Sequence, residues 1–311
     1  MTGVLEGFAT IAVVIAVGWV LAHLGILDTT AQNVLSRLAF YVASPALLVV
    51  VMARTPISAV FSANLVSSMG SVVVTVAVYL VLSRWRWPAP LGESTIGALC
   101  ASYVNAGNLG IPIALYVLGD VSLMAPTLLM QLLLITPVSM ALLDADARGT
   151  RPTLRRSLGR ILRNPVTVGA LIGILVSAVR SHVPDLVLQP VGLVGNLAVP
   201  AMLIAFGISL RRGPLPGAGG SWGQVGTLVA LKLVVQPVAA VAIGAGLVGL
   251  RGPALFAAAV TAALPTAQNI FTYANRYNRA LFLARDAIFV STFASVPVIV
   301  LIAGVFDVLG G

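Results

Sequence analysis

The chain alternates between long apolar runs and short polar or Gly/Pro-containing segments. A helix that spans a membrane needs about 20 mostly apolar residues. Ten runs approach or exceed this length, and they cover residues 4–24, 33–53, 60–82, 94–118, 121–143, 165–181, 186–209, 221–249, 253–276 and 281–306. The pattern predicts an all-α membrane protein with ten transmembrane helices, of which the sixth is the shortest. Residues 4–24 are expected to be the first span and not a cleaved signal peptide, because no basic region precedes them and no small-x-small site follows.

Composition leads to the same class. Of 311 residues, 59% are hydrophobic and 9% are charged, whereas a soluble domain carries about 25% charged residues. One cysteine, Cys100, excludes an internal disulfide and a multi-cysteine metal site, and His23 and His182 are too far apart for a zinc motif. We therefore expect no metal and no cofactor. The net charge of +9 does not indicate nucleic-acid binding, because the basic residues lie between apolar runs rather than on one face.

The basic residues predict the orientation in the membrane. If the longest polar segment, 144–164, is cytoplasmic, thirteen basic residues fall on that side and three on the other. Because cytoplasmic loops carry an excess of Lys and Arg, this distribution predicts a multi-pass protein of the cell (inner) membrane with both termini outside. Segment 144–164 is then a basic cytoplasmic loop that sets the topology, and contact with anionic membrane lipid is a second interpretation of it.

The two halves of the chain resemble each other. Gly18 corresponds to Gly173, and Pro45-Ala46-Leu47-Leu48 corresponds to Pro200-Ala201-Met202-Leu203, both at an offset of 155 residues. We therefore predict two five-helix repeats, residues 1–143 and 165–311. Because five is odd, the second repeat enters the membrane upside down, which is the inverted-repeat plan of many secondary transporters.

Two of the predicted helices contain helix-breaking residues near their middle. In span 4, Pro112 cannot donate to the carbonyl of Asn108, and Gly107 and Gly110 lower the cost of unwinding. Span 9 carries Pro265 in the corresponding place. Interrupted backbone at this depth must line a polar cavity or be buried in protein.

The half-helices expected after these prolines would point their N-termini, which carry positive partial charge, toward a common point. Amide and hydroxyl side chains flank both prolines. The predicted substrate-binding residues are Asn105, Asn108, Gly110 and Pro112 in span 4, and Pro265, Thr266, Gln268 and Asn269 in span 9. The alternative interpretation is that the prolines only kink the helices and that the amides hold neighbouring helices together.

These motifs resemble a known family. The stretch Asn105-x-Gly-Asn108-x-Gly-x-Pro112, with Leu264-Pro265-Thr266-x-x-Asn269 and the following Tyr273-Ala274, is similar to the auxin efflux carrier family of membrane transporters. The resemblance implies the fold shared with bile-acid symporters and sodium/proton antiporters, in which broken helices 4 and 9 cross. It also implies a scaffold domain of spans 1, 2, 6 and 7, a transport domain of spans 3–5 and 8–10, and a small organic anion such as auxin, malate or malonate as substrate.

Ionisable residues inside predicted spans are costly and are therefore candidates for function. Lys232, the one lysine of the chain, lies in span 8 with Gln236 one turn further on the same face. It snorkels to the interface, pairs with a substrate carboxylate, or replaces a coupling cation by its own charge. Asp286 in span 10 is a candidate proton carrier or part of a local ion pair. Gln131 and Ser291 line the transport route or hold helices together.

The sequence as a whole predicts a secondary active transporter for a small organic anion, and not an enzyme. An intramembrane enzyme is disfavoured because neither a Gly-x-Ser-x-Gly motif nor facing mid-span aspartates occur. A passive channel or a membrane sensor is a further alternative. A proton or the membrane potential is the expected energy source. Sodium is less favoured, because spans 4 and 9 lack paired carboxylates, but a sodium-coupled carrier like the bile-acid symporters stays an alternative. A homodimer is one assembly that the sequence leaves open.

Overall fold

The structure is a computed structural model that describes residues 2–54, 63–149, 165–179, 184–212, 217 and 222–308. Of residues 2–8, Asn108 and Asp185 it describes the backbone alone. Most of the predicted basic loop, from residue 150 to residue 164, lies outside the described residues. Within the described ranges the chain forms helices and, apart from one isolated bridge, no strand. The all-α prediction is therefore confirmed for this part of the chain.

Helices occur in all ten apolar ranges. The first five ranges contain α1 (Thr2–His23), α2 (Thr29–Leu38), η1 (Ala39–Ala43), α3 (Ser44–Arg54), α5 (Ala63–Arg86), α6 (Leu91–Ser102), η2 (Ala106–Gly110), α7 (Ile111–Tyr116), η3 (Val121–Met124), α8 (Ala125–Met130), η4 (Gln131–Ile135) and α9 (Thr136–Arg148). The last five contain α11 (Pro165–Ala178), α12 (Asp185–Gly195), α13 (Ala198–Arg212), α14 (Trp222–Ala230), η5 (Leu231–Val235), α15 (Gln236–Gly246), α16 (Gly252–Ala262), α17 (Asn269–Tyr277) and α18 (Leu281–Val308).

Several of these elements join into helices that are long and apolar enough to cross a membrane. Among the described residues six runs meet that requirement: Thr29–Arg54, Ala63–Arg86, Val121–Arg148, Leu186–Arg212, Trp222–Gly246 and Leu281–Val308. Shorter apolar helices lie at Ala9–His23, Pro165–Ala178 and Gly252–Ala262. The chain is thus a multi-pass membrane protein.

Four prolines lie in helices that widen before them rather than break. Four π-helical turns, η1, η2, η4 and η5, each end two residues before a proline, namely Pro45, Pro112, Pro137 and Pro237. A proline ring clashes with the carbonyl four residues earlier and offers it no N–H. A wider turn with i to i+5 hydrogen bonds moves that carbonyl aside, and the helix continues through the proline.

The interruption in the fourth range therefore does not lie at Pro112, where the sequence suggested it. Helix α6 ends at Ser102, residues 103–105 are non-helical, and the helix resumes at Ala106 and runs through Pro112 to Tyr116. In the ninth range, residues 263–268 separate α16 from α17, and Pro265 lies inside this interruption as expected.

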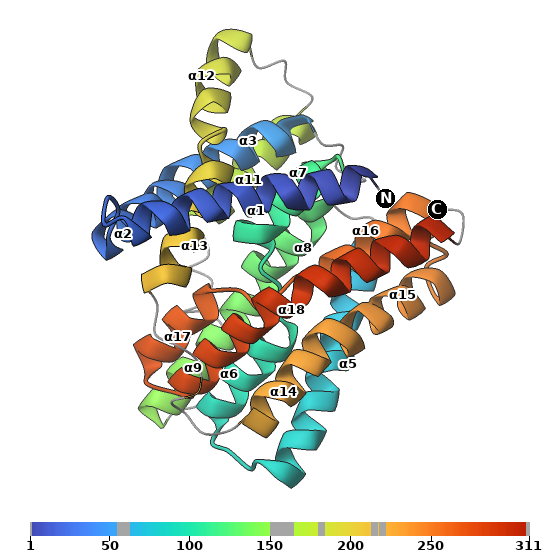
Figure 1. The fold of residues 1–311 in the computed structure, drawn as a ribbon. Helices are drawn as coiled ribbons and strands as arrows, with labels where there is room; N and C mark the ends of the chain where they lie inside the picture. The colour runs from blue at the N-terminus through green and yellow to red at the C-terminus, as the bar shows by residue number, and fades with distance from the viewer. Residues whose placement is uncertain are drawn as a thin grey trace.

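The seventh range, which forms the long run Leu186–Arg212, contains a local turn. A turn at Asn196-Leu197 divides it into α12 and α13, and α12 projects away from the rest of the molecule (Figure 1). Pro200 accounts for this division, because it cannot donate to the carbonyl of Asn196, four residues earlier.

Glycines allow close packing in two helix pairs that join the two halves of the chain. Helix α1 packs along α13, and α11 packs along α3. A Cβ at Gly18 would collide with the backbone of Ile204, and one at Gly173 would collide with Met52 on α3. Small residues that let helix backbones approach closely are the usual basis of helix association in membranes. Gly18 and Gly173, which the sequence comparison paired, therefore do the same thing: each lets its helix approach a neighbouring helix closely.

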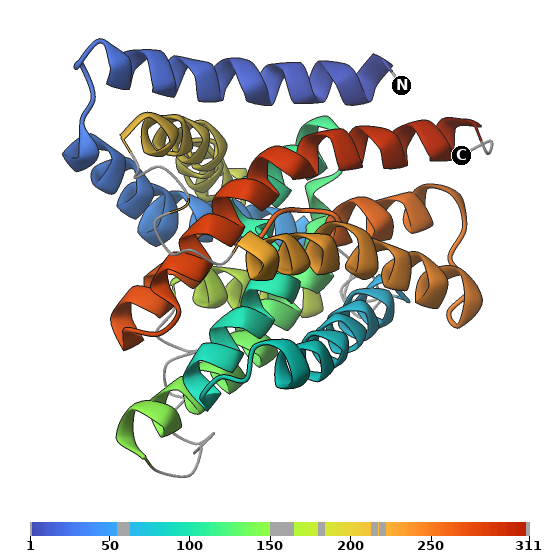
Figure 2. The same ribbon diagram turned by 60° about the horizontal axis from the view of Figure 1, so that its bottom comes forward.

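A second group of helices packs around α5, α6 and α15. Helix α5 lies against α15 and α6, α6 lies against α9, and α18 lies against α14, α16 and α17. In Figures 1 and 2 this group lies below α1, and α18 runs across it. The start of α1 and the end of α18 lie on the same side of the molecule in both views.

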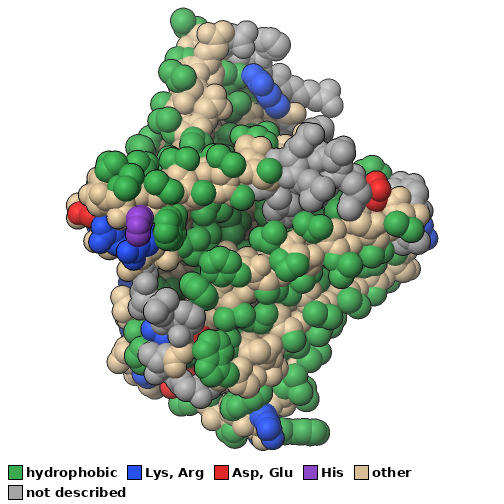
Figure 3. Space-filling view, viewed as in Figure 1, with side chains coloured by type: hydrophobic (Ala, Val, Ile, Leu, Met, Phe, Trp, Pro, Cys, Tyr) green, Lys and Arg blue, Asp and Glu red, His purple; other side chains and the backbone are tan. Residues whose placement is uncertain are grey.

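The surface has the character expected for lipid contact. Large apolar side chains are exposed on most helices, including Val13 on α1, Leu175 on α11, Val238 on α15 and Leu301 on α18. Figure 3 shows that apolar side chains cover much of the face in view, and that Lys and Arg gather at its edges. An apolar exterior of this extent suits a membrane and would be a liability in water.

Candidate functional site

The two interruptions pair with each other through their backbones. Val104 and Thr266 form an isolated antiparallel bridge. The amide of Asn105 donates to the carbonyl of Pro265 at 2.8 Å, and the amide of Ala267 donates to the carbonyl of Tyr103 at 3.1 Å. Two non-helical segments far apart in the sequence thereby satisfy part of each other's polar backbone, which is a requirement for non-helical backbone at membrane depth.

Polar side chains satisfy further carbonyls around this bridge. The Thr266 hydroxyl donates to the carbonyl of Cys100 at 2.6 Å, and Gln131 Nε2 donates to the carbonyl of Val104 at 2.9 Å. The Thr266 amide in turn donates to the Ser291 hydroxyl at 3.1 Å. Thr266, Gln131 and Ser291 are all buried. The structure therefore brings these three predicted residues together, with their polar atoms directed at protein groups.

Two helices, α6 and α16, end at the bridge, and Lys232 of η5 and Gln236 of α15 contact their C-terminal ends. Lys232 is 0% exposed, and its Nζ donates to the carbonyl of Ala262, the last residue of α16, at 2.7 Å. It also donates to Gln236 Oε1 at 2.8 Å. Gln236 Nε2 donates to the carbonyl of Ser102, the last residue of α6, at 2.9 Å. Helix C-termini carry negative partial charge and carbonyls without intrahelical partners, and the lysine amine satisfies one of these carbonyls.

The opposite ends, the N-termini of two helices, begin close to the same bridge. The half-helix of η2 and α7 starts at Ala106, two residues after Val104, and α17 starts at Asn269, three residues after Thr266. Helix N-termini carry positive partial charge and backbone N–H groups without intrahelical partners. A helix end of this kind is suited to an anion, and both ends begin within three residues of the bridge.

Open space adjoins the first of these N-termini. A Cβ built on Gly107 would meet nothing within 4 Å, although Asn105 and Ala106 just before it are buried. Gly110, one turn later, faces the packed side, where a Cβ would lie 3.0 Å from Leu264 Cδ1 and 3.2 Å from Met124 Sδ. Gly107 therefore marks the open side of the interruption.

The start of α17 contributes amides and a tyrosine. Gln268, Asn269 and Tyr273 are partly exposed, and Asn269 Nδ2 donates to the Tyr273 hydroxyl at 3.2 Å. The buried Tyr103, in the first interruption, shares a hydrogen bond of 2.9 Å with the Thr136 hydroxyl. The sequence analysis did not identify these two tyrosines as ligands. Their position, at or just after a helix break, is the feature that could have indicated them.

Three predicted residues need separate placement. Asn105 is 2% exposed, with its backbone in the bridge described above. The Asn108 side chain lies outside the described part of the structure, so its predicted role stays a prediction. Asp286 lies five residues before Ser291 on α18, about 7.5 Å along the helix axis. Its carboxylate accepts from Arg285 Nε at 2.8 Å and from the amide of Gly217 at 3.1 Å.

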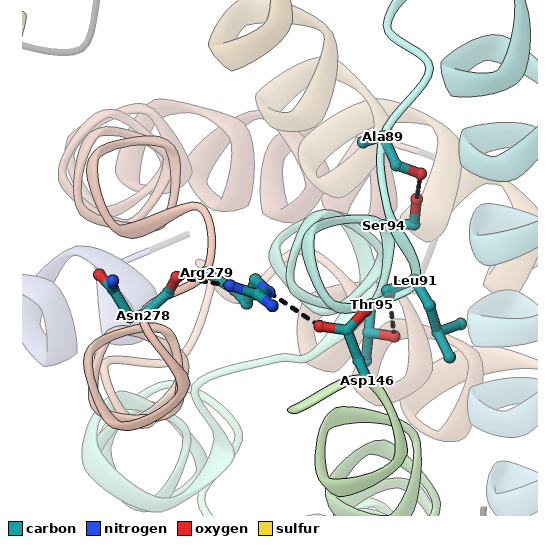
Figure 4. Close-up of polar contacts among 7 residues, drawn as sticks. All are labelled: Ala89, Leu91, Ser94, Thr95, Asp146, Asn278 and Arg279. Carbon is teal, nitrogen blue, oxygen red and sulfur yellow. Dashed lines mark hydrogen bonds and ion pairs between the residues drawn. The ribbon is translucent and has the colours of Figure 1, made fainter. Parts of the chain in front are cut away.

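The far end of α17 is fastened to α9 and lies near the start of α6. Tyr277 donates to Asp144 Oδ1 at 2.7 Å, and Arg279 Nε donates to Asp146 Oδ2 at 2.8 Å. Figure 4 shows the Arg279 guanidinium directed at Asp146, beside the first turn of α6 with Thr95. These contacts fix which face of α17 is turned toward the other helices.

The described residues contain no group of three or more His, Cys, Asp or Glu that could hold a metal ion. The polar atoms at the bridge are instead amides, hydroxyls, backbone groups and one lysine. Most of these atoms bond to one another or to backbone groups in or just before the two interruptions.

Comparison with known proteins places this geometry in context. A sequence model of the family described as "Membrane transport protein" matches residues 4–303. The chain is 26% identical over 293 residues to a protein of Rhizobium meliloti (strain 1021) named "Putative malonate transporter", with 92% of this chain and 90% of that protein covered. "Probable auxin efflux carrier component 5b" of Oryza sativa subsp. japonica is 28% identical over 158 residues, which is 49% of this chain and 42% of that protein. "Auxin efflux carrier component 3" of Arabidopsis thaliana is 32% identical over 124 residues, which is 38% of this chain and 19% of that protein.

Proposed function

The chain belongs to the family of membrane transport proteins that includes the auxin efflux carriers, and from this premise we propose that it is a secondary active transporter. It moves a small organic anion, a carboxylate, by alternating access across the cell (inner) membrane. The observation that carries this proposal is the backbone pairing of the two interruptions at Val104 and Thr266. It gathers the ends of four helices at one point, with two N-termini available to an anion.

The proposed architecture has ten spans in two inverted five-helix repeats, with both termini outside. Two packing pairs support it, because α1, the first span of one repeat, packs on α13 in the second span of the other, and α11 packs on α3 in the same way. These four spans form the scaffold domain, and spans 3–5 and 8–10 form the transport domain. The start of α1 and the end of α18 lie on one side (Figure 1), as an even number of spans requires.

The proposed binding site lies between the N-termini of the η2–α7 half-helix and α17. Each helix end is equivalent to about half a positive charge, so the two together match a carboxylate. Asn108, Gln268 and Asn269 supply the amide donors, and Gly107 leaves room for the ligand. Gly110 and Pro112 shape the first half-helix, and Pro265 shapes the second interruption. Four further predicted residues stabilise the two interruptions rather than contact the ligand, because their hydrogen bonds go to protein groups. They are Thr266, Gln131, Ser291 and Asn105.

Lys232 takes the place of a coupling cation in this proposal. Its Nζ bonds Ala262 directly and reaches Ser102 through Gln236, so one resident charge serves both helix C-termini. A carrier with this arrangement needs no sodium ion to bind those carbonyls. The membrane potential or a proton gradient then supplies the energy, and one charge moved through 100 mV is worth about 2.3 kcal/mol.

The substrate class comes from the family and the site together. A relative that covers nearly the whole chain is named for malonate transport, and a small dicarboxylate or monocarboxylate fits a site built from helix N-termini and amides. A sodium-coupled carrier like the bile-acid symporters is the alternative, favoured only if backbone carbonyls bind sodium beside Lys232.

Reconstitution into liposomes tests the proposal. We expect labelled malonate, or another member of a panel of mono- and dicarboxylates, to accumulate against its gradient when a potassium diffusion potential is applied, with or without sodium. Gly107→Leu should abolish accumulation without unfolding the protein, because open space surrounds Gly107. Gly226→Leu is the matched control, since a Cβ there also meets nothing within 4 Å, and Gly226 lies on α14, away from the bridge.

Each result of this experiment has a defined meaning. Unsaturable flux with a measurable conductance would indicate a channel and refute the carrier. Accumulation that requires sodium would favour the sodium-coupled alternative. Unchanged accumulation in Gly107→Leu would show that the substrate does not pass the bridge.

A further inference from the structure

Helix α17 has one packed face and one polar exposed face. Ile270 and Ala274 are buried against neighbouring helices, and the main packing partners of α17 are α18, α6 and α9. The opposite face carries Thr272, Asn275 and Arg276, and all three are exposed. Helix α17 runs from the bridge toward the side of the membrane that carries most of the arginines, here called the arginine-rich side. Thr272 and Asn275 would therefore lie at membrane depth, and Arg276 lies in the last turn of the helix. Polar side chains that face lipid at this depth are costly, so this face requires water.

The other half-helix is buried over most of α7, although its last two residues, Leu115 and Tyr116, are exposed. In α7, Ile111, Pro112 and Ile113 are buried, and α7 packs against α1. One apolar cluster joins Leu109 and Ile111 with Ile11 of α1 and Leu203 of α13. The half-helix that runs from the bridge toward the side of the termini is thus closed against the scaffold helices. The two half-helices therefore differ, because the polar face of α17 is exposed and the first four residues of α7 are buried.

One of the three arginines at this end differs from the other two. Arg279 pairs with Asp146, and Arg285 pairs with Asp286, each at 2.8 Å. Arg276 has no carboxylate partner among the residues that the structure describes, and its guanidinium lies 5.7 Å from the centre of the Tyr277 ring. An exposed, uncompensated cation on a polar helix face attracts anions. Arg276 lies seven residues after Asn269 on this helix, about 10 Å along the axis.

We infer that the face of α17 formed by Thr272, Asn275 and Arg276 lines the substrate pathway between the bridge and the arginine-rich side, and that Arg276 captures the anion there. The inference rests on the proposed function and adds to it an entry route and a residue that sets apparent affinity. Arg276 concentrates the carboxylate about two turns from the site, and the uncharged Asn275 and Thr272 lead it onward. The capture is electrostatic, so salt weakens it.

Thiol labelling tests the pathway without requiring a known substrate. The one native cysteine, Cys100, is buried. Labelling of a cysteine introduced at Thr272 or Asn275 is therefore measured without a contribution from Cys100. We expect a charged, membrane-impermeant methanethiosulfonate to modify both at least tenfold faster than a cysteine at Val238, which is exposed on the apolar surface of α15. Equal rates at the three positions would overturn the inference, whatever the outcome for transport.

Kinetics test the capture role of Arg276. We expect Arg276→Gln to raise the KM for malonate uptake about tenfold at low salt, with kcat changed less than twofold and with the difference shrinking at 0.5 M potassium chloride. Arg276→Lys should restore most of the affinity. Arg84→Gln, which removes an exposed arginine from the end of α5, should leave KM unchanged. An unchanged KM in Arg276→Gln would overturn the capture role. Failure of the unaltered protein to transport any carboxylate would instead refute the proposed function.

Discussion

Replacing Lys232 by methionine keeps the volume and length of the side chain and removes its amine. In the structure that amine makes two hydrogen bonds, 2.7 Å to the carbonyl of Ala262 and 2.8 Å to Gln236 Oε1, and the residue is 0% exposed. The substitution therefore leaves two buried acceptors without this donor, one of them at the C-terminus of α16. Water cannot replace the amine without space and further polar partners.

The magnitude follows from these two bonds. A buried acceptor that loses its donor costs about 1–3 kcal/mol, and here two acceptors lose theirs. We expect Lys232→Met to lower the free energy of unfolding by about 2–6 kcal/mol. At about 2–4 °C per kcal/mol for chains of 150–250 residues, the corresponding decrease in Tm is on the order of 10 °C.

Thermal unfolding in detergent, followed by tryptophan fluorescence from the four tryptophans, measures this decrease. Arg84→Met is the matched control, because it removes a basic group from an exposed position and should change Tm by less than 2 °C. A second variant tests the role of the charge. Lys232→Ser leaves a space beside carbonyl oxygens, which are good ligands for small cations, so sodium chloride should raise its Tm more than choline chloride does. A decrease of less than 2 °C in Lys232→Met would refute the reasoning.

Three further results are expected. Asn269→Ala removes a donor at the start of α17, and a lost hydrogen bond of about 1.5–3 kcal/mol to a charged ligand should raise the Kd for the carboxylate about 10- to 100-fold in equilibrium binding. Gly207→Val places a side chain against the backbone of Ile15 on α1, and overpacking of about 1–3 kcal/mol or more should lower Tm, whereas Gly226→Val should not. A double-mutant cycle of Arg279→Gln and Asp146→Asn should give a coupling energy of about 0.2–1 kcal/mol, because the Arg279 side chain is 35% exposed, and coupling well above that range would contradict the surface character of this pair.

The apolar runs predicted where the helices lie, because burial in lipid depends on composition over about 20 residues. The predicted position of the interruption in the fourth apolar range was wrong for a local reason. The π-helical turn η2 absorbs the effect of Pro112, and the chain breaks at residues 103–105 instead. That location depends on pairing with Pro265 and Thr266, which is a tertiary contact. The spacing of prolines along the sequence does not predict this contact.

The predicted site residues divide in a similar way. The sequence identified polar groups inside apolar spans, but polarity does not tell which partner a side chain takes. Thr266 and Gln131 turn to backbone carbonyls, whereas Gln268 and Asn269 stay partly exposed. The sequence offered three interpretations of Lys232, and the burial of its amine against Ala262 disfavours one of them, snorkelling to the interface. The sequence indicated Gly107 as a residue that eases unwinding, and the structure adds the open space beside it, which no sequence pattern predicts.

A fixed lysine at the helix C-termini has a consequence for the direction of transport. In the proposed mechanism Lys232 stays with the protein in every conformation, so the net charge that crosses with the substrate is that of the anion alone. In a cell whose interior is negative, each unit of negative charge is then driven outward by about 2.3 kcal/mol per 100 mV, which favours export. Proteoliposomes should reverse the direction of net flux when the imposed potential is reversed, and flux that ignores the potential but follows the pH gradient would instead require a proton to travel with the anion.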